Sequence, residues 1–476
     1  MAYPDWVLRH KTKGTNISCI KGKYYLYSVT SRWDKEKGRS QKITTGYLGR
    51  ITEDGLIPPK SRIDTEKPKI TVKEYGATRF LLDVGDDILR KLHIVFPKYA
   101  EMLFSLAAIR VMYHCPFRRM ELHYEYSYLS ETFAGLNLSK NHLTGFLRTI
   151  GGDRRKIIDF MEQFVQGNGH ILFDATSILS KSEKMNINRN GYNSKKEYDP
   201  QVNLLYAFSK EERTPVYYRV VPGNIREVTA LKLSVEESGI RDMIVVADKG
   251  FASAANLDMM DDASLKYIIP LKRNSQWFDK SILKTGNKGM FDGYFIWQKR
   301  VIWHYAKTLD NGKHVFVFLD DELRTSEQKT YLNNIERNLE GYTQQAFLEK
   351  QYVFGTIVMI TNTDKTAENV YSSYKERGEI EQSFDFLKNL LEQDKSYMQN
   401  EKSLEAWAFI NHISLLLNYK IFNLLRDSKK IKKYSIEELI SHLKYISKAK
   451  INAEWFTTEI TQNTSDLLAD LNIHIT

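Results

Sequence analysis

The spacing of apolar residues changes several times along the chain, and each change predicts a different kind of element. Residues 16–48 alternate between apolar and polar side chains, which is typical of strands, and Lys21-Gly22 between two such runs predicts a hairpin. From about Ala77 to Phe164 the apolar positions recur every three or four residues, which is typical of helices. We therefore expect an N-terminal β-rich segment followed by a helical region.

Between residues 170 and 271 the pattern changes to alternating strands and helices. Ile171-Leu172-Phe173 predicts a short strand that ends at Asp174. Residues 243–247 form a continuous apolar run, which is the sign of a strand buried on both faces. Further strand-like runs and helical segments lie between and after these two, so this part of the chain is predicted to be an α/β core.

Short alternating runs rich in aromatic residues interrupt this rhythm over residues 272–350 and predict a β-rich insertion. A buried strand resumes at about Val353 to Ile360, and a long helix is predicted over residues 366–395. Beyond residue 400 the pattern stays helical to near the end of the sequence.

Charge adds an asymmetry to this picture. The 476 residues carry 69 Lys and Arg against 59 Asp and Glu, a net charge of +10. Residues 1–50 hold 11 basic and 3 acidic side chains, whereas residues 301–400 hold 11 basic and 16 acidic ones. A basic end favours a polyanionic partner such as nucleic acid, although charge alone is equally consistent with a solvated basic face.

Two exclusions narrow the class of protein. Cys19 and Cys115 are the two cysteines of the sequence, too few for a disulfide framework or a multi-cysteine zinc module. The apolar stretch from Ala408 to Leu417 is about half as long as a membrane span requires. We therefore expect an intracellular protein with no membrane partner.

Three acidic residues stand out by their position. Asp174 and Asp248 each follow an apolar strand-like run, and ligand sites form at strand ends in α/β sheets. For either residue alone, capping of the following turn is the commoner role. Glu381 lies on the predicted helix, and three carboxylates brought together would favour a bound cation. Few carboxylate ligands suit Mg²⁺ or Mn²⁺, and two such ions can support an in-line displacement at phosphorus.

The helix predicted over residues 366–395 brings polar side chains together. At about 100° per residue, four of them fall within roughly 60° of arc, directly beside the apolar face. They are Tyr374, Arg377, Glu381 and Lys388. A salt-bridged surface helix would show the same pattern. Next to a carboxylate site, Arg377 and Lys388 would instead hold phosphates.

Three motifs carry a resemblance to a known family. They are Asp174-Ala175-Thr176-Ser177, Asp248-x-Gly250-Phe251 and Tyr374-x2-Arg377-x3-Glu381-x6-Lys388. These motifs resemble the signature regions of bacterial DDE insertion-sequence transposases, in particular the subgroup with a Y-R-E-K helix and a β-rich insertion before the glutamate. The resemblance covers about residues 168–420, including Phe409-x2-His412, which is similar to the helix that follows the glutamate helix in this family.

The resemblance implies an α/β fold with an RNase H-like mixed sheet. In this interpretation the sheet is interrupted by the insertion and flanked by an N-terminal β plus helical DNA-binding region and a C-terminal helical region. The expected domains are residues 1–70 (basic, β-rich), 71–167 (helical, DNA-binding), 168–271 with 351–400 (split catalytic domain), 272–350 (β-rich insertion) and 401–476 (helical).

The resemblance also implies a function. Asp174, Asp248 and Glu381 would be catalytic and would bind Mg²⁺ or Mn²⁺, with two ions expected. Tyr374, Arg377 and Lys388 would contact DNA phosphates. The protein would bind the terminal inverted repeats of its insertion sequence, cleave the DNA and join the 3′-hydroxyl ends to target DNA. A homodimer in the DNA complex and a cytoplasmic, nucleoid-associated location are expected.

Two alternative functions stay open. The chain could be an RNase H-like nuclease without strand transfer, or a catalytically inactive DNA-binding relative. Outside the acidic motifs, the run Arg154-Arg155-Lys156 is a candidate phosphate contact. Trp297 could stack an unpaired base, although packing within the insertion is the favoured role for an aromatic residue there.

The charge of the N-terminal segment generates a first prediction. Deletion of residues 1–70 should remove specific binding to the element's ends, because residues 1–50 carry a net charge of +8 (11 basic minus 3 acidic side chains) that favours phosphate contacts. Gel-shift titration with a terminal-repeat duplex measures the effect. Unchanged affinity of the truncated protein would contradict the prediction.

Overall fold

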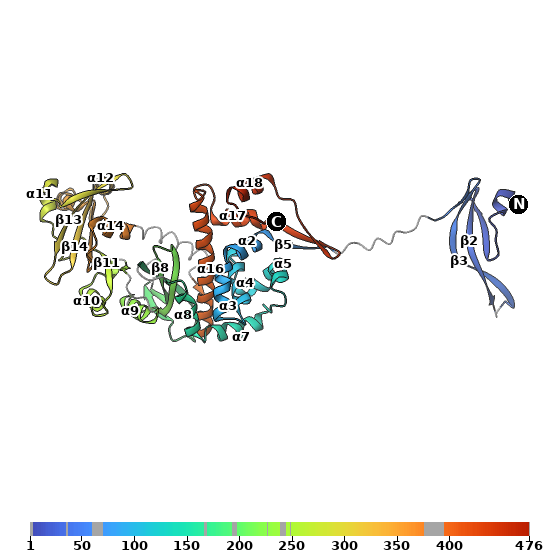
Figure 1. Ribbon diagram of the computed structural model, residues 1–476, viewed down its shortest axis with the longest axis horizontal. Coiled ribbons are helices and arrows are strands. Elements are labelled where there is room, and N and C mark those ends of the chain that lie inside the picture. Colours follow the sequence, from blue (N-terminus) through green and yellow to red (C-terminus); the bar gives the residue numbers. More distant parts are fainter. Residues whose placement is uncertain are drawn as a thin grey trace. The chain divides into compact units, whose positions relative to one another are not determined.

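The computed structural model describes residues 3–34, 37–59, 70–165, 169–192, 198–225, 227–238, 244–247, 249–375 and 395–475 (Figure 1). Contacts between residues divide the chain into two compact units, Met1–Lys69 and Ile70–Thr476. In the described part of the chain, no helix is long and apolar enough to cross a membrane.

The first unit is a small antiparallel sheet with one short helix. Its elements are α1 (Asp5–Leu8), β1 (Thr15–Ile20), β2 (Lys23–Asp34), β3 (Arg39–Thr52) and β4 (Gly55–Ile57). The four strands pair in chain order, and Lys21-Gly22 turns between the first two, as the alternating pattern predicts. The core consists of Val7, Ile17, Leu26 and Ile51, with Tyr3, Trp6 and Tyr24 packed against it.

The second unit begins with one strand and a helical region. These elements are β5 (Ile70–Glu74), α2 (Gly76–Val84), α3 (Asp86–Val95), α4 (Ala100–Tyr113), α5 (Met120–Tyr126), α6 (Leu129–Thr132), α7 (Lys140–Ile150) and α8 (Arg154–Glu162), with a 3₁₀ turn at Phe117–Arg119. Nearly all of α4 is buried, because α16 (Glu401–Asp427) packs along it. Figure 1 shows α16 standing between α2, α3 and α4 on one side and the large sheet on the other, while α8 lies beside the sheet.

A mixed sheet forms the centre of the second unit. Its strands are β6 (His170–Ser180), β7 (Arg189–Tyr192), β8 (Tyr198–Ser209), β9 (Thr214–Pro222), β10 (Ile244–Val246) and β11 (Lys266–Leu271). In the order β9-β8-β6-β10-β11, the first three strands are antiparallel and β10 and β11 run parallel to β6. This is the strand order of the RNase H-like fold, so the predicted fold class is confirmed. The helices α9 (Glu227–Ser238) and α10 (Ala254–Asp262) lie beside β9 and β11, and a 3₁₀ turn spans Lys249–Phe251.

The insertion extends this same sheet. Its strands are β12 (Gly293–Trp297), β13 (Arg300–Thr308) and β14 (His314–Asp320), and β14 pairs with β15 (Thr356–Thr361), which returns to β11. The insertion also contains α11 (Ser281–Thr285), α12 (Asp321–Glu336) and α13 (Gln344–Lys350), with 3₁₀ turns at Lys288–Met290 and Gln351–Val353. Of the expected β-rich segment, residues 272–350, strands occupy residues 293–320, whereas residues 272–292 and 321–350 contain helices and 3₁₀ turns instead.

The C-terminal part is mainly helical, with one hairpin that the apolar pattern did not predict. It contains α14 (Ala367–Lys375), β16 (Lys395–Ser396), α16, α17 (Ile436–Lys444), β17 (Ser447–Ile451), β18 (Glu454–Thr457) and α18 (Gln462–Asp470). The hairpin β17–β18 pairs with β5 from the start of the unit. Segments at the two ends of this unit are thereby joined.

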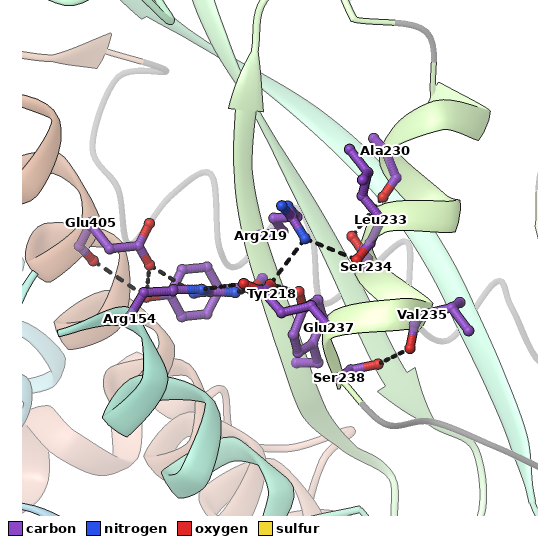
Figure 2. Close-up of polar contacts among 11 residues, drawn as sticks. Arg154, Tyr218, Arg219, Ala230, Leu233, Ser234, Val235, Glu237, Ser238 and Glu405 are labelled. Atoms are coloured by element: carbon purple, nitrogen blue, oxygen red, sulfur yellow. Dashed lines mark hydrogen bonds and ion pairs between the residues drawn. The ribbon is translucent and has the colours of Figure 1, made fainter.

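The guanidinium of Arg154 links four elements of the second unit (Figure 2). Nη1 donates to Oε1 of Glu405 on α16 at 2.7 Å, and Nη2 donates to Oε2 of Glu237 on α9 at 2.9 Å. Nη2 also donates to the carbonyl oxygen of Tyr218 on β9 at 2.7 Å. The Tyr218 hydroxyl donates to Glu405 at 2.7 Å, and Arg219 donates to Glu237 at 3.1 Å. Arg154 itself begins α8, so the network connects α8, β9, α9 and α16.

The ionisation of this network follows from its burial and its partners. Burial alone would lower the pKa of Arg154, but the charge of Glu405 and the hydrogen bond to Glu237 hold it well above its usual value. Burial alone would raise the pKa of Glu237, but hydrogen bonds and charge from Arg154 hold it below its usual value. Arg154 is therefore committed to internal ion pairs, and its assignment as a phosphate contact is wrong.

Removal of the guanidinium generates the second prediction. Arg154→Met leaves the partly buried Glu405 without its cation and Glu237 with Arg219 alone, so we expect the free energy of unfolding to fall by about 3 kcal/mol. Arg155→Met on the same helix is the matched control, because its side chain is 69% exposed, and it should cost no more than about 0.5 kcal/mol. Denaturant unfolding measures both, and equal effects would contradict the prediction.

The same network predicts a pH dependence. The lowered pKa of Glu237 contributes stability that is present above the usual pKa of 4.5 and is lost as the pH falls through the folded-state pKa. The difference in stability between the wild type and Arg154→Met should therefore narrow below about pH 4.5.

Candidate active site

The first candidate carboxylate, Asp174, belongs to the central strand of the sheet. The sequence pattern predicts that this strand ends at Asp174, but β6 continues to Ser180. It continues because β8 pairs with it from Ile171 to Leu179. Asp174 pairs with Tyr206 of β8 on one side. On the other side, the last described pair with the parallel strand β10 joins Leu172 to Val246. Asp174 thus lies just beyond the point where described pairing with β10 stops.

The second candidate, Asp248, lies outside the described residues. The residues around it are placed: Ile244–Val246 form β10 and are buried, and Lys249–Phe251 form a 3₁₀ turn. Asp248 follows Val246 by two positions, just as Asp174 follows its partner Leu172 by two positions. The equal spacing is the basis for treating the two residues as a pair.

The third motif is placed in part. Helix α14 ends at Lys375 and includes Tyr374, which is half-buried and packed against the core. Arg377, Glu381 and Lys388 lie outside the described residues. The structure therefore fixes where the Y-R-E-K segment begins.

Aromatic side chains of the insertion hold α14 in place. The ring of Tyr371 is fully buried, and its centroid lies 5.0 Å from that of Phe318 and 5.4 Å from that of Phe295. Trp297 packs edge-on against the same ring at 6.1 Å. Trp297 is therefore a packing residue of the insertion, which is the role that the sequence favoured.

Two cations and one buried carboxylate lie near the end of α14. The buried Asp320 caps α12 by accepting from the backbone N–H of Leu323 at 3.0 Å and forms an ion pair with Arg300. The ammonium of Lys375 lies 5.5 Å from the centroid of Tyr371. Burial and the charge of Arg300 lower the pKa of Lys375, while Asp320 opposes the shift. The ion pair of Arg300 with Asp320 and the electrostatic effect of both on Lys375 were not predicted, because these three residues lie far apart in the sequence.

The motif Phe409-x2-His412 on α16 has a structural role beside β8 and β9. His412 lies on α16, is fully buried and packs against Tyr206 and Tyr218, with ring centroids 6.2 and 5.3 Å away. Burial, with the charge of Arg154, lowers its pKa to about 3, so the imidazole is neutral. This helix thereby packs against the tyrosine whose backbone pairs with Asp174.

The described part of the chain holds no second candidate metal centre. Among its residues, no group of three or more His, Cys, Asp or Glu side chains is arranged to hold a metal ion. The side chains of Asp174, Asp248 and Glu381 are not among the described ones, so this absence neither supports nor opposes the predicted ligand set.

The sheet order and the motifs along it define an RNase H-like enzyme domain. A family model described as "Transposase DDE domain" matches residues 166–417, which is more than half of the chain. The chain therefore belongs to this family and is a DDE transposase. Its assignment to the Y-R-E-K subgroup and its bacterial origin stay predictions.

Two further comparisons accompany this match. Among solved structures, the chain is similar to a piggyBac transposase synaptic complex with hairpin DNA, determined by cryo-EM. The TM-score is 0.37 and the identity 10%, over 72% of this chain and 69% of that chain. Among curated proteins, no match is found.

The aromatic contacts of α14 generate the third prediction. Tyr371→Ala should lower the free energy of unfolding by about 4 kcal/mol, because it leaves a large cavity among aromatic rings. Tyr371→Phe is the matched control and should cost less than about 1 kcal/mol, since the hydroxyl has no hydrogen-bond partner within the described part of the chain. Denaturant unfolding followed by tryptophan fluorescence tests both variants. A small effect of the alanine variant would show that α14 does not depend on these ring contacts.

Proposed function

We propose that Asp174, Asp248 and Glu381 form one catalytic carboxylate site, which cleaves DNA at the ends of an insertion sequence and joins the 3′-hydroxyl ends to target DNA. The observation that carries the proposal is the position of Asp174, next to the point where the described pairing with the parallel strand β10 stops. Ligand sites of α/β sheets form where neighbouring strands end. Membership of the DDE transposase family supplies the reaction class.

The chemistry of this donor set fits divalent cations. Three carboxylates and no histidine or cysteine suit Mg²⁺ or Mn²⁺, and two bound ions would supply a nucleophile at neutral pH and stabilisation of the leaving oxygen. The protein's own contribution is to hold the carboxylates. β6 is paired on both sides up to Leu172 and therefore gives Asp174 a rigid backbone.

The proposal assigns DNA contacts to the helix that follows β15. Tyr374, Arg377 and Lys388 would contact phosphates, with Arg377 using its planar fork and Lys388 acting as a point charge. Support comes from the position of α14 beside β11 and from the ammonium of Lys375 at its C-terminal end, whereas Arg300 is paired with Asp320. A cation at this position favours a polyanion.

The proposal also retains the expected organisation. Residues 168–271 and 351–400 are proposed to form the catalytic domain, with residues 272–350 inserted between them. The partners would be the terminal inverted repeats and target DNA. Two DNA ends must be brought together, so a homodimer in the DNA complex and a nucleoid-associated location belong to the same proposal.

Isosteric substitution of the carboxylates tests the site and is the fourth prediction. Asp174→Asn, Asp248→Asn and Glu381→Gln should each reduce Mg²⁺-dependent cleavage of an element-end duplex by about a thousandfold, because a ligand charge is removed while shape is kept. Asp262→Asn, an exposed residue on α10, should cleave like the wild type. Gel shifts in EDTA should show unchanged DNA binding for all four variants. Normal cleavage by any triad variant would show that the residue has no catalytic role.

One assay with the wild type separates the proposed function from the two alternatives. Incubation of a pre-cleaved end with a supercoiled plasmid and Mg²⁺ should give joined products. Cleavage without joining would favour a nuclease, and DNA binding without any metal-dependent cleavage would favour an inactive relative.

A further inference from the structure

Two strands of the first unit continue together past the rest of their sheet. β1 pairs with β2 only from Lys23 to Ser28, and β4 pairs with β3 only from Arg50 to Thr52. Beyond Ser28, the segment Val29–Asp34 pairs with Arg39–Thr44 and, within the described residues, with no other strand (Figure 1). Six residue pairs at about 3.3 Å each give a two-stranded ribbon roughly 20 Å long. We call these two segments the ribbon.

The root of the ribbon is built to a defined geometry. Two register shifts occur between Leu26 and Tyr27 and between Ser28 and Val29, and such bulges bend a strand and increase its twist. The hydroxyl of Thr45 donates to that of Ser28 at 2.9 Å at the second shift. Gly49, opposite Leu26, has φ +147, and a Cβ there would lie 2.3 Å from the carbonyl oxygen of Ile57. The ribbon therefore continues from the sheet with a defined bend and twist.

The side chains of the ribbon serve no core. Every described residue from Thr30 to Trp33 and from Arg39 to Thr45 is exposed, and Trp33 is 63% exposed. A two-stranded ribbon gains little stability by itself, and its unpaired edges invite association with other chains. Because the ribbon adds little stability and exposes unpaired strand edges, we expect it to have a binding function.

The two faces of the ribbon differ in chemistry. Residues opposite each other in an antiparallel pair share a face, so Arg32 lies beside Gln41, flanked by the pair Asp34 and Arg39 on one side and by Thr30 and Ile43 on the other. The other face holds Trp33 and Lys42, with serine and threonine between them. Within the described part of the chain, Arg32 and Gln41 make no hydrogen bond or ion pair with protein.

We propose that the ribbon enters the major groove of DNA and that Arg32 and Gln41 contact base edges there. The major groove, about 12 Å wide, admits a two-stranded ribbon. Arginine is suited to bidentate contact with guanine and glutamine with adenine, and both side chains here are adjacent and, within the described residues, without protein partners. Arg39 and Lys42 lie on opposite faces and contact the phosphates on the two sides of the groove. The inference rests on the proposed function in one respect, that the substrate is double-stranded DNA.

Selection from a randomised duplex pool by the full-length protein in EDTA tests this proposal. The wild type should enrich one sequence, and Arg32→Ala/Gln41→Ala should lose the preference at the contacted positions. Its affinity for the selected sequence should fall by about tenfold or more for each bidentate pair that the substitutions remove. The control Lys21→Ala/Lys23→Ala removes charge from the turn between β1 and β2 and from the first residue of β2, at the end of the strand away from the ribbon, and should enrich the same sequence as the wild type.

Arg32→Lys distinguishes base contact from simple charge. Lysine keeps the positive charge but lacks the planar fork, so this variant should keep the salt dependence of binding and lose the preference at one position. Melting temperatures equal to that of the wild type are expected, because the substituted side chains are exposed.

Three outcomes would overturn the proposal. They are enrichment of the same sequence with equal affinity by Arg32→Ala/Gln41→Ala, no enrichment by the wild type, and a change of oligomeric mass with unchanged DNA binding. The last would identify the ribbon as a contact between copies of the chain. Because selection is done without divalent ions, failure of the ribbon proposal is distinguishable from failure of the carboxylate site, which is measured by cleavage.

Discussion

The internal ion pairs of Arg154 are the constraint on which the rest of the second unit depends. A buried guanidinium needs its charge balanced and its donors used, and Glu237, Glu405 and the Tyr218 carbonyl meet both needs. These partners can meet only if α16 lies at one position along β9. That position places His412 against Tyr206, whose backbone pairs with Asp174. The Arg154 ion pairs thus tie α16, which also packs on α4, to the strand β9 and through Tyr206 to the strand that pairs with Asp174.

The insertion completes this arrangement from the other edge of the sheet. Because β15 returns antiparallel to β11, β14 extends the sheet instead of forming a separate layer. Its aromatic face then provides the surface on which Tyr371 docks, and α14 leads from there toward the position of Glu381 in the sequence. The insertion thereby holds α14, the helix on which the Y-R-E-K segment begins, against the extended sheet. Its aromatic residues contribute packing energy at α14, the last described element before the segment that contains Glu381 in the sequence.

The sequence predicted elements whose apolar pattern is strong and missed those that depend on distant partners. The run at residues 243–247 identifies β10 because burial on both faces requires continuous apolar residues. α12 was missed because none of its residues is buried, and β17 because Ser447–Ile451 has little apolar alternation and pairs with a strand from the far end of the unit. At the site, the pattern located Asp174 in the right strand but not its extent, which β8 sets. Arg154 shows the general difficulty, since a basic run has the same composition whether it faces phosphates or buried carboxylates.

The two units differ in how much apolar surface they bury. The second has one continuous core, whereas the first buries four apolar side chains fully and partly covers three aromatic ones. A unit with so small a core is marginal by itself, because little apolar surface is removed from water. Binding to DNA stabilises whatever unit makes the contact, by an amount that grows with the ratio of DNA concentration to the dissociation constant. On the proposal that the ribbon binds DNA, this free energy is a larger share of the small stability of the first unit than it would be of the stability of the second unit.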